Sequence, residues 1–354
     1  MSDELSKPPL DQDQVTFVWD TLEITNPGVL ASSLSPFENK IAHLPAAKEL
    51  IAQLTGSFAA TRQVFETIYP STEARPAYHN DTHACLTAWN ATKIYLGYLR
   101  ANHGRFDQDF FDLLLAGASF HEIDDWWAHA AGGQKPANYQ QALDLVRDHL
   151  TKKGISTDDF NRVIKLDDFN KTLDQSVQDA LELSPENGLL KESNGQRSKL
   201  AALAQREQQD EEPADEKRVA ILKTLGQFIS GADFAQVLDH NYQVKIPQNQ
   251  NNNIYLFHQG VASLANEMEH FRPDDAIPDG WKTEGKLDWQ KVGTSNDFLD
   301  ILRNKLEPAL PYLDRFYDVT KPNELSSAPA TDSYQMFTAS ARLYQGHNSK
   351  KKPA

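Results

Sequence analysis

Apolar residues along much of the chain return at steps of three and four positions, which is the spacing of one face of an α-helix. The pattern is clearest between Ala46 and Tyr69, where it comprises Leu50, Ile51, Leu54, Phe58 and Phe65. It predicts a helix over this segment, and the loop PSTEARPA that follows is expected to end it.

The same spacing predicts further helices over residues 80–99, 138–150, 219–238, 254–271 and 296–317. Asn80 or Asp81 is the expected N-cap of the first of these. The run from Phe110 to Phe120 is apolar nearly all round, which indicates a central buried helix. No strand series, repeat period or glycine-rich phosphate loop is apparent in the sequence, so the predicted fold class is all-α.

Composition divides the chain into a core and three polar segments. We expect residues 1–14 to form a disordered tail and residues 341–354 to form a solvated basic tail. Residues 174–215 are polar, charged and poor in aromatic side chains, as in a flexible insertion or exposed helices. The remainder, 15–340, is expected to be one helical domain that includes this insertion.

The formal net charge of −15 argues against a surface for duplex nucleic acid, because phosphate contacts need clustered Lys and Arg. An anionic substrate is still compatible with this charge, because a bound metal ion reverses the local field. Cys85 is the only cysteine, so no intramolecular disulfide forms and a reducing compartment fits. Without a secretory signal or a long apolar run, the expected location is the cytoplasm.

The stretch YHNDTHA, residues 78–84, holds the first candidate chemistry. His79 and His83 are four residues apart, so on a helix their side chains share one face and can serve one site. Eleven histidines in the chain make such a pair unremarkable by itself, and two surface histidines are the alternative interpretation.

The second candidate is FHEIDD, residues 120–125, at the end of the most hydrophobic helix. Ionised groups in such a setting are costly unless they are paired or bound to a metal. The alternative is that the helix has reached solvent, so that Glu122, Asp124 and Asp125 are exposed.

The third candidate is Asp233, which shares one stripe of the 219–238 helix with Leu222, Leu225 and Ile229. Aspartate is seldom buried without a partner. Its alternatives are a salt bridge to a core Arg or Lys, or a helix break at Gly231 that turns Asp233 outward.

Taken together, His83, His121, Glu122 and Asp233 supply two imidazoles and two carboxylates from three separate helices. This donor set suits a divalent ion such as Mn, Fe, Zn, Co or Mg, and leaves coordination positions open for water. If the motifs were instead coincidental in a structural helical protein, His83, His121 and Asp233 would lie far apart.

RPAYHNDTHA, then FHEIDD, then GADFAQV, in that order and spacing, resembles the HD superfamily of metal-dependent phosphohydrolases over roughly residues 75–238. The pattern is similar to cyclic-nucleotide phosphodiesterases (YHNxxHA, HDxxH and a late Asp) and to small bacterial predicted phosphohydrolases. The resemblance implies an HD-like helical bundle, to which the hydrophobic pattern adds C-terminal helices beyond the region of resemblance. It also implies hydrolysis of a phosphoester, in a nucleotide or related small phosphorylated metabolite.

By position, the resemblance implies that His83, His121, Glu122 and Asp233 are metal ligands and that His79 is the general acid for the leaving oxygen. Asp125 or Asp124 would then orient the water nucleophile. Arg75 is open to two interpretations, a contact to a phosphate oxygen or a structural role in its loop. Asn80 is likewise a substrate contact or a helix cap.

Two positions differ from the family pattern. Glu122 replaces the aspartate that names the superfamily, which moves the carboxylate by about 1.5 Å. Asp125 stands where the phosphodiesterases have the second histidine of HDxxH. These differences support an alternative hypothesis, a catalytically degenerate HD-like module that binds a ligand or a protein.

Overall fold

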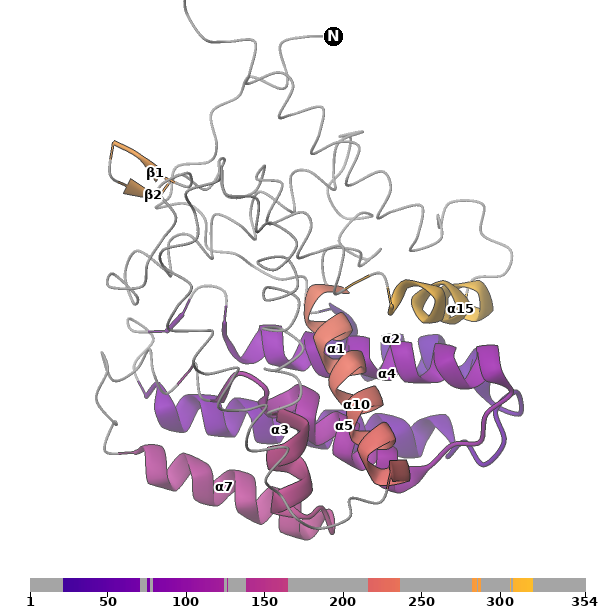
Figure 1. Ribbon diagram of the computed structural model, residues 1–354, viewed down its shortest axis with the longest axis horizontal. Helices are drawn as coiled ribbons and strands as arrows, with labels where there is room; N and C mark the ends of the chain where they lie inside the picture. The colour runs from indigo at the N-terminus through magenta and orange to yellow at the C-terminus, as the bar shows by residue number, and fades with distance from the viewer. Residues whose placement is uncertain are drawn as a thin grey trace, which may run out of the picture.

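The computed structural model describes residues 22–70, 75–76, 79–123, 126, 138–164, 216–235, 282–284, 286–287, 306 and 308–320. Helices dominate these residues, which confirms the all-α class (Figure 1). The elements are α1 (Leu22–Thr25), α2 (Pro27–Leu34), η3 (Ser35–Phe37), α3 (Ala47–Ile68), α4 (Asp81–Asn102), α5 (Gln108–Phe120), α7 (Tyr139–Lys152), α10 (Glu216–Ala235), β1 (Lys282–Thr283), β2 (Lys286–Leu287) and α15 (Leu310–Thr320).

The long helices expected from the periodic pattern are present. Helices α3, α4, α5, α7 and α10 coincide with five predicted segments, with ends that differ by a few residues. Asn80 is the N-cap of α4, and its side chain accepts a hydrogen bond from the backbone N–H of His83. Asp107 caps α5 in the same way, accepting from Phe110 N.

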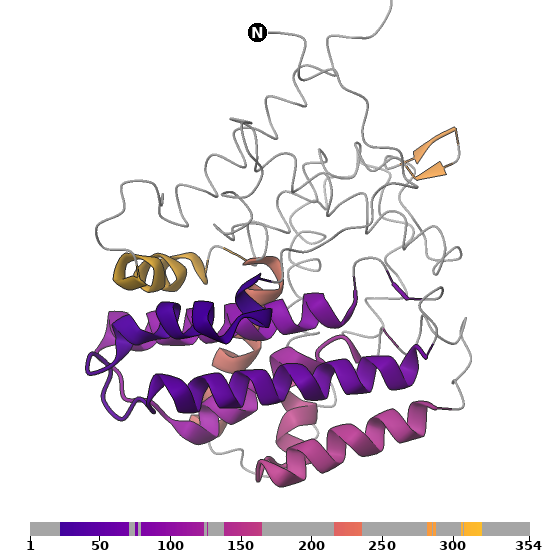
Figure 2. The ribbon, with the colours of Figure 1, turned by 180° about the vertical axis from the view of Figure 1, so that it is seen from behind.

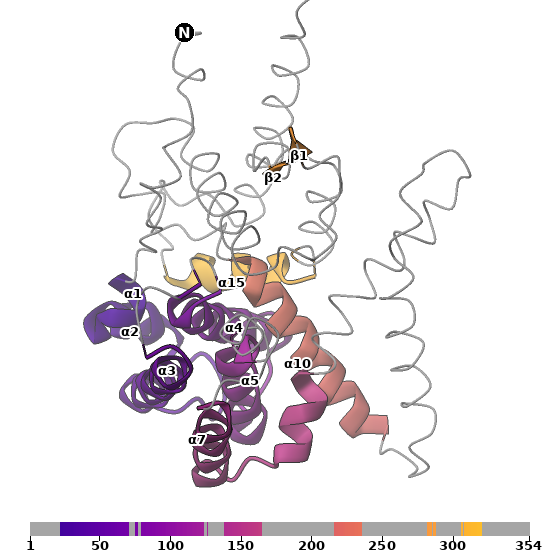
Figure 3. The same cartoon turned by 90° about the vertical axis from the view of Figure 1, so that its left-hand side faces the viewer.

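Helix α4 is the centre of the fold because its side chains are buried on nearly every side from His83 to Leu99. Helices α3, α5, α10 and α15 all pack against it. Helix α10 crosses α4 and α5 on one side of the molecule (Figure 1), and from behind α3 lies between α4 and α7 (Figure 2). Seen nearly along α3 and α7, α10 is inclined to both of them (Figure 3).

Two glycines allow neighbouring helices to approach closely. A Cβ added at Gly97 would lie 1.8 Å from the backbone oxygen of Tyr312, so α15 rests directly on the backbone of α4. A Cβ at Gly117 would lie 2.6 Å from Ile229 Cδ1 and 3.0 Å from Val163 Cγ1, so α5 likewise has no room for a side chain where it meets α10.

The apolar interior consists of two clusters. One, around Trp89, Phe111 and Phe316, joins α4 to α2, α10 and α15. The other, around Phe65, Phe120 and Trp126, joins α3, α5 and α7. Ala84 belongs to the second cluster and Cys85 to the first, so the start of α4 lies where the two clusters meet.

The structure adds short elements that the hydrophobic pattern does not reveal. Helices α1 and α2 and the turn η3 precede α3, and α2 begins with Asn26 as N-cap and Pro27 in its first turn. Strands β1 and β2, of two residues each, form an antiparallel pair in which Lys282 lies opposite Leu287 and Thr283 opposite Lys286. Two residues are too few to show an alternating pattern.

Several predictions concern residues outside those that the structure describes. These are the two tails, the insertion 174–215, the helix over 254–271 and the first part of the helix over 296–317, of which α15 covers the end. The single-domain assignment stays a prediction. Within the described part of the chain, no helix is both long and apolar enough to cross a bilayer.

Candidate metal centre

His83 lies in the first turn of α4 and is fully buried. The Asn80 side chain accepts from His83 N at 3.0 Å, so the cap that starts the helix also fixes the backbone of this residue. Thr87, one turn on, donates its hydroxyl to the His83 carbonyl oxygen. The imidazole therefore projects from an anchored helix start into the junction of the two core clusters.

His121 and Glu122 follow the last turn of α5. His121 is the C-cap of the helix, and its Nδ1 lies 2.7 Å from the carbonyl oxygen of Ala118. Because a carbonyl only accepts, Nδ1 carries the proton and Nε2 is the nitrogen that faces the site. A backbone hydrogen bond of this kind commonly orients a metal-bound histidine.

Glu122 is only 2% exposed, so the interpretation in which the helix reaches solvent at this point is wrong for this residue. Trp126, one turn later, donates its backbone N–H to Glu122 O, and the Trp126 carbonyl accepts from the hydroxyl of Tyr69 at 2.6 Å. Tyr69 is the C-cap of α3, so α3 supports the turn that carries Glu122.

Asp233 lies on α10, in the stripe that also contains the buried Leu225 and Ile229. The helix continues through Gly231, so the proposed break there is wrong, and Asp233 is 9% exposed. It therefore faces inward, towards the two histidines.

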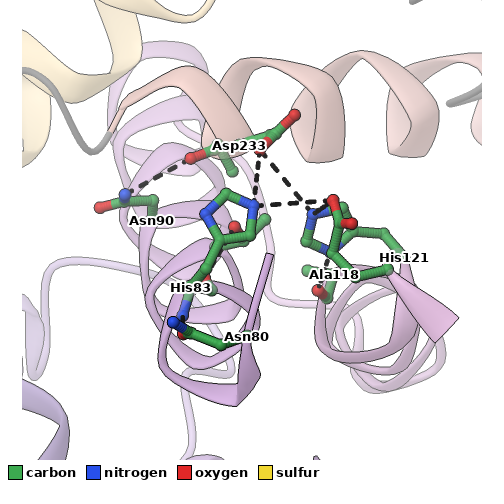
Figure 4. A network of polar contacts seen from close by, with 9 residues as sticks. Asn80, His83, Asn90, Ala118, His121 and Asp233 are labelled. Carbon is green, nitrogen blue, oxygen red and sulfur yellow. Dashed lines mark hydrogen bonds and ion pairs between the residues drawn. The ribbon is translucent and has the colours of Figure 1, made fainter. Parts of the chain in front are cut away.

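The side chains of His83, His121 and Asp233 point toward one another, as Figure 4 shows, and Glu122 completes this group of four. His83 Nε2 lies 3.0 Å from Asp233 Oδ1 and 3.6 Å from Glu122 Oε1. His121 Nε2 lies 3.0 Å from Glu122 Oε1 and 3.8 Å from Asp233 Oδ1. One ligand atom from each residue lies within 4.8 Å of the others. The expectation of widely separated residues in a purely structural protein is therefore wrong.

These separations suit one cation. Ligands about 2.1 Å from a common ion lie about 3.0 Å apart at right angles and about 3.4 Å apart in a tetrahedron. The longer Glu122 side chain does not remove its carboxylate from the group, since Oε1 is as close to His121 as Asp233 Oδ1 is to His83. The chain thus has a buried group of side chains that could hold a metal ion.

The charge state of Glu122 also fits a cation. Burial raises the pKa of its carboxyl, but the positive charges of His79 and His121, in their protonated forms, outweigh burial and hold the pKa well below 4.5. Among the described residues, Glu122 Oε2 has no hydrogen-bond partner. An ionised carboxylate with a buried oxygen lacking a donor is costly unless a cation neutralises it.

His79 lies beside this group without belonging to it. Its ring centroid is 5.7 Å from that of His83, with the two rings nearly perpendicular. Its charge contributes to the low pKa of Glu122, which places the imidazole within electrostatic reach of the carboxylate. This position, next to the cluster but outside the ligand set, is compatible with proton transfer.

Arg75 contacts the protein rather than the cluster. Its Nη2 lies 3.3 Å from the Tyr69 carbonyl oxygen, and its guanidinium lies over the Phe65 ring at 5.4 Å. Burial raises the pKa of Asp81, and the charges of Arg62 and Arg75 oppose this. These contacts support the structural interpretation of Arg75, as the cap geometry does for Asn80. Asp124 and Asp125 lie outside the described residues.

One polar residue near the site was not foreseen. Asn90, 1% exposed on α4, donates from Nδ2 to the carbonyl oxygen of Ala232 at 3.4 Å. Its position seven residues after His83, in a run of buried residues, was a signal available in the sequence, because an amide rarely lies in such a run without a specific partner.

No protein-family model, curated protein or solved structure matches the chain. The functional interpretation therefore rests on the geometry described above and on the motifs of the sequence.

Proposed function

We propose that this protein is a metal-dependent phosphohydrolase of the HD type, acting on a phosphoester in a nucleotide or a related small metabolite. The observation that carries the proposal is the convergence of His83, His121, Glu122 and Asp233 from three helices on one buried point. The order of the motifs along the chain supports the same class.

In this proposal His83 and His121 bind a divalent ion through Nε2, and Glu122 and Asp233 bind it through one carboxylate oxygen each. When bound, the ion supplies an activated water and Lewis-acid polarisation of a phosphoryl oxygen. Two imidazoles and two carboxylates suit Mn, Fe, Co or Zn, with Mg a weaker match for the nitrogen ligands.

The other residues act on protons and on orientation. His79, one turn before His83, holds the proton that the departing oxygen takes up, a task for which an imidazole is suited near neutral pH. Asp124 or Asp125 orients the attacking water. Arg75 and Asn80 hold the loop and the helix start that place His79 and His83.

Metal analysis and a phosphoester screen test the proposal together. The purified protein is analysed for bound metal and assayed, with Mn, Fe, Co, Zn and Mg, on 2′,3′- and 3′,5′-cyclic nucleotides, nucleoside monophosphates and a chromogenic diester. We expect His83→Ala, His121→Ala and Asp233→Ala each to lose bound metal and turnover. The exposed His103→Asn and Asp109→Asn are matched controls that should retain both.

His79→Ala separates chemistry from metal binding. Loss of a general acid lowers the rate by about 10²–10⁴-fold, and we expect metal content to remain unchanged in this variant. Unchanged turnover in His79→Ala would remove His79 from the mechanism.

The degenerate binding module makes the opposite prediction for the whole protein. It requires no hydrolysis of any ester in the screen with any metal. The position of Glu122 Oε1 within the ligand group argues against it, because the replacement of aspartate by glutamate has kept the carboxylate at the site. Absence of turnover on every ester would favour the binding module, and absence of bound metal as well would overturn the metal centre and favour the binding module further.

A further inference from the structure

Asn90 is an amide buried within an apolar helix contact. Its neighbours Ala88, Trp89 and Ala91 are all buried, and α10, which packs against α4, contributes the buried Phe228, Ile229 and Ala232 to the same apolar cluster. A buried amide is unfavourable unless it is hydrogen-bonded, so its partner indicates what it does.

The partner is the backbone of the helix that carries Asp233. Asn90 Nδ2 donates to the carbonyl oxygen of Ala232, the residue directly before Asp233 (Figure 4). Seven residues are about two turns of a helix, so Asn90 and His83 lie on the same side of α4. One side of α4 therefore presents both a ligand and the contact to the segment that holds another ligand.

Apolar packing alone would position Asp233 poorly. Burial of apolar surface is non-directional, so it tolerates sliding and rotation of α10 against α4. The Asp233 carboxylate, in contrast, must lie 3.0 Å from His83 Nε2 and 3.8 Å from His121 Nε2. A directional hydrogen bond beside Asp233 restricts both movements.

The other two ligand-bearing segments have comparable polar contacts. Asn80 fixes the backbone of His83, and the Ala118 carbonyl fixes the His121 ring. The Asn90–Ala232 hydrogen bond is the corresponding contact for α10.

We propose that Asn90 is a positioning residue: it sets the axial position and rotation of α10 on α4, and thereby the affinity and coordination geometry of the metal centre. The inference rests on the proposed metal centre. Asn90 itself is not one of the four candidate ligands.

The test is a comparison of Asn90→Leu with Thr92→Val in the full chain. Thr92 is also 1% exposed on α4, but its hydroxyl bonds to Ala88 O of the same helix. Binding of Co²⁺ is measured by calorimetry, and the visible spectrum of bound Co²⁺ reports the coordination geometry. Loss of an orienting contact typically weakens metal binding about 10–100-fold. We expect that loss and an altered spectrum in Asn90→Leu, and neither in Thr92→Val.

A double-mutant cycle with Asp233→Asn, which keeps an oxygen donor at this position, distinguishes positioning from a general effect on stability. If Asn90 acts through Asp233, the Asn90→Leu substitution should change Co²⁺ affinity much less in the Asp233→Asn background. Asn90→Ala, which adds no bulk, is measured in parallel, with circular dichroism to verify folding of every variant.

Each result has a separate meaning. Absence of Co²⁺ binding by the wild-type protein overturns the metal centre, and the role of Asn90 with it. If the wild-type protein binds Co²⁺ tightly, either of two results overturns the role of Asn90 alone. In the first, both Asn90 variants bind Co²⁺ as tightly as Thr92→Val does. In the second, they lower Co²⁺ affinity equally whether position 233 carries aspartate or its substitution.

Discussion

Gly97→Ala should destabilise the protein strongly, although it adds a single methyl group. The new Cβ would lie 1.8 Å from the backbone oxygen of Tyr312, and ordinary contacts begin at 3.4 Å. Helix α15 would therefore have to move back by about 1.6 Å, because a backbone atom cannot rotate away as the end of a side chain can.

That movement separates α4 from the buried Leu310, Leu313 and Phe316 of α15. A gap of 0.5–1 Å already removes a quarter to a half of the dispersion energy at each contact. Because the required shift is larger, we expect a loss of about 3 kcal/mol in the free energy of unfolding, the upper end of the usual range for overpacking. The melting temperature should fall by about 6 °C or more.

Gly56→Ala is the matched control. Gly56 lies exposed in the middle of α3, and a Cβ there would meet nothing within 4 Å. Alanine should raise the free energy of unfolding by about 0.5–1 kcal/mol at this position. Both variants are followed by chemical denaturation and calorimetry. A Gly97→Ala protein as stable as the wild type would refute the close contact between α4 and α15.

Three further outcomes are expected. Removal of bound metal with a chelator should lower the melting temperature. Adding the metal back at 100 times its dissociation constant should raise the free energy of unfolding by about 2.7 kcal/mol, which a thermal-shift assay measures. The same concentration of metal should have no effect on Asp233→Ala. Burial lowers the pKa of His149 below its ordinary 6.5, with Lys153 and Lys152 adding to the effect, so the unfolded chain binds the proton more readily. The free energy of unfolding should thus decrease as the pH drops below 6.5, and this decrease should be smaller in His149→Gln. Chemical denaturation between pH 5 and pH 8, the range about the ordinary histidine pKa, measures the difference. Burial also raises the pKa of the Cys85 thiol, so a thiol reagent should modify it only after unfolding, and rapid labelling of the native protein would contradict its burial.

The long helices could be predicted from the sequence because each buries at least one apolar face, and α4 and the second half of α5 are buried on nearly every side. The short α1 and α2 were missed, since four to eight residues hold too little periodicity to detect. Their signals were local instead: Asn26 followed by Pro27 is a common helix start.

Glu122 and Asp233 could be predicted as candidate ligands because each is a polar exception in an apolar context, whereas His83 was a candidate because it lies four residues after His79. Their convergence could not be predicted from spacing, because it depends on how α10 docks against α4 and α5. At this docking contact Ile229 lies against Gly117, and Asn90 donates to the Ala232 carbonyl oxygen, contacts that only the three-dimensional arrangement reveals.

In the proposed metal centre, the distribution of the candidate ligands along the chain determines when an ion can be acquired. Asp233 follows Glu122 by 111 positions, and closing a segment of that length costs about 4 kcal/mol of chain entropy. A nascent polypeptide that has left the ribosome only as far as α7 offers His83, His121 and Glu122 but lacks the fourth donor. Tight loading of this centre would therefore await synthesis and docking of α10, so uptake of the ion would mark a molecule in which α10 has docked against α4 and α5.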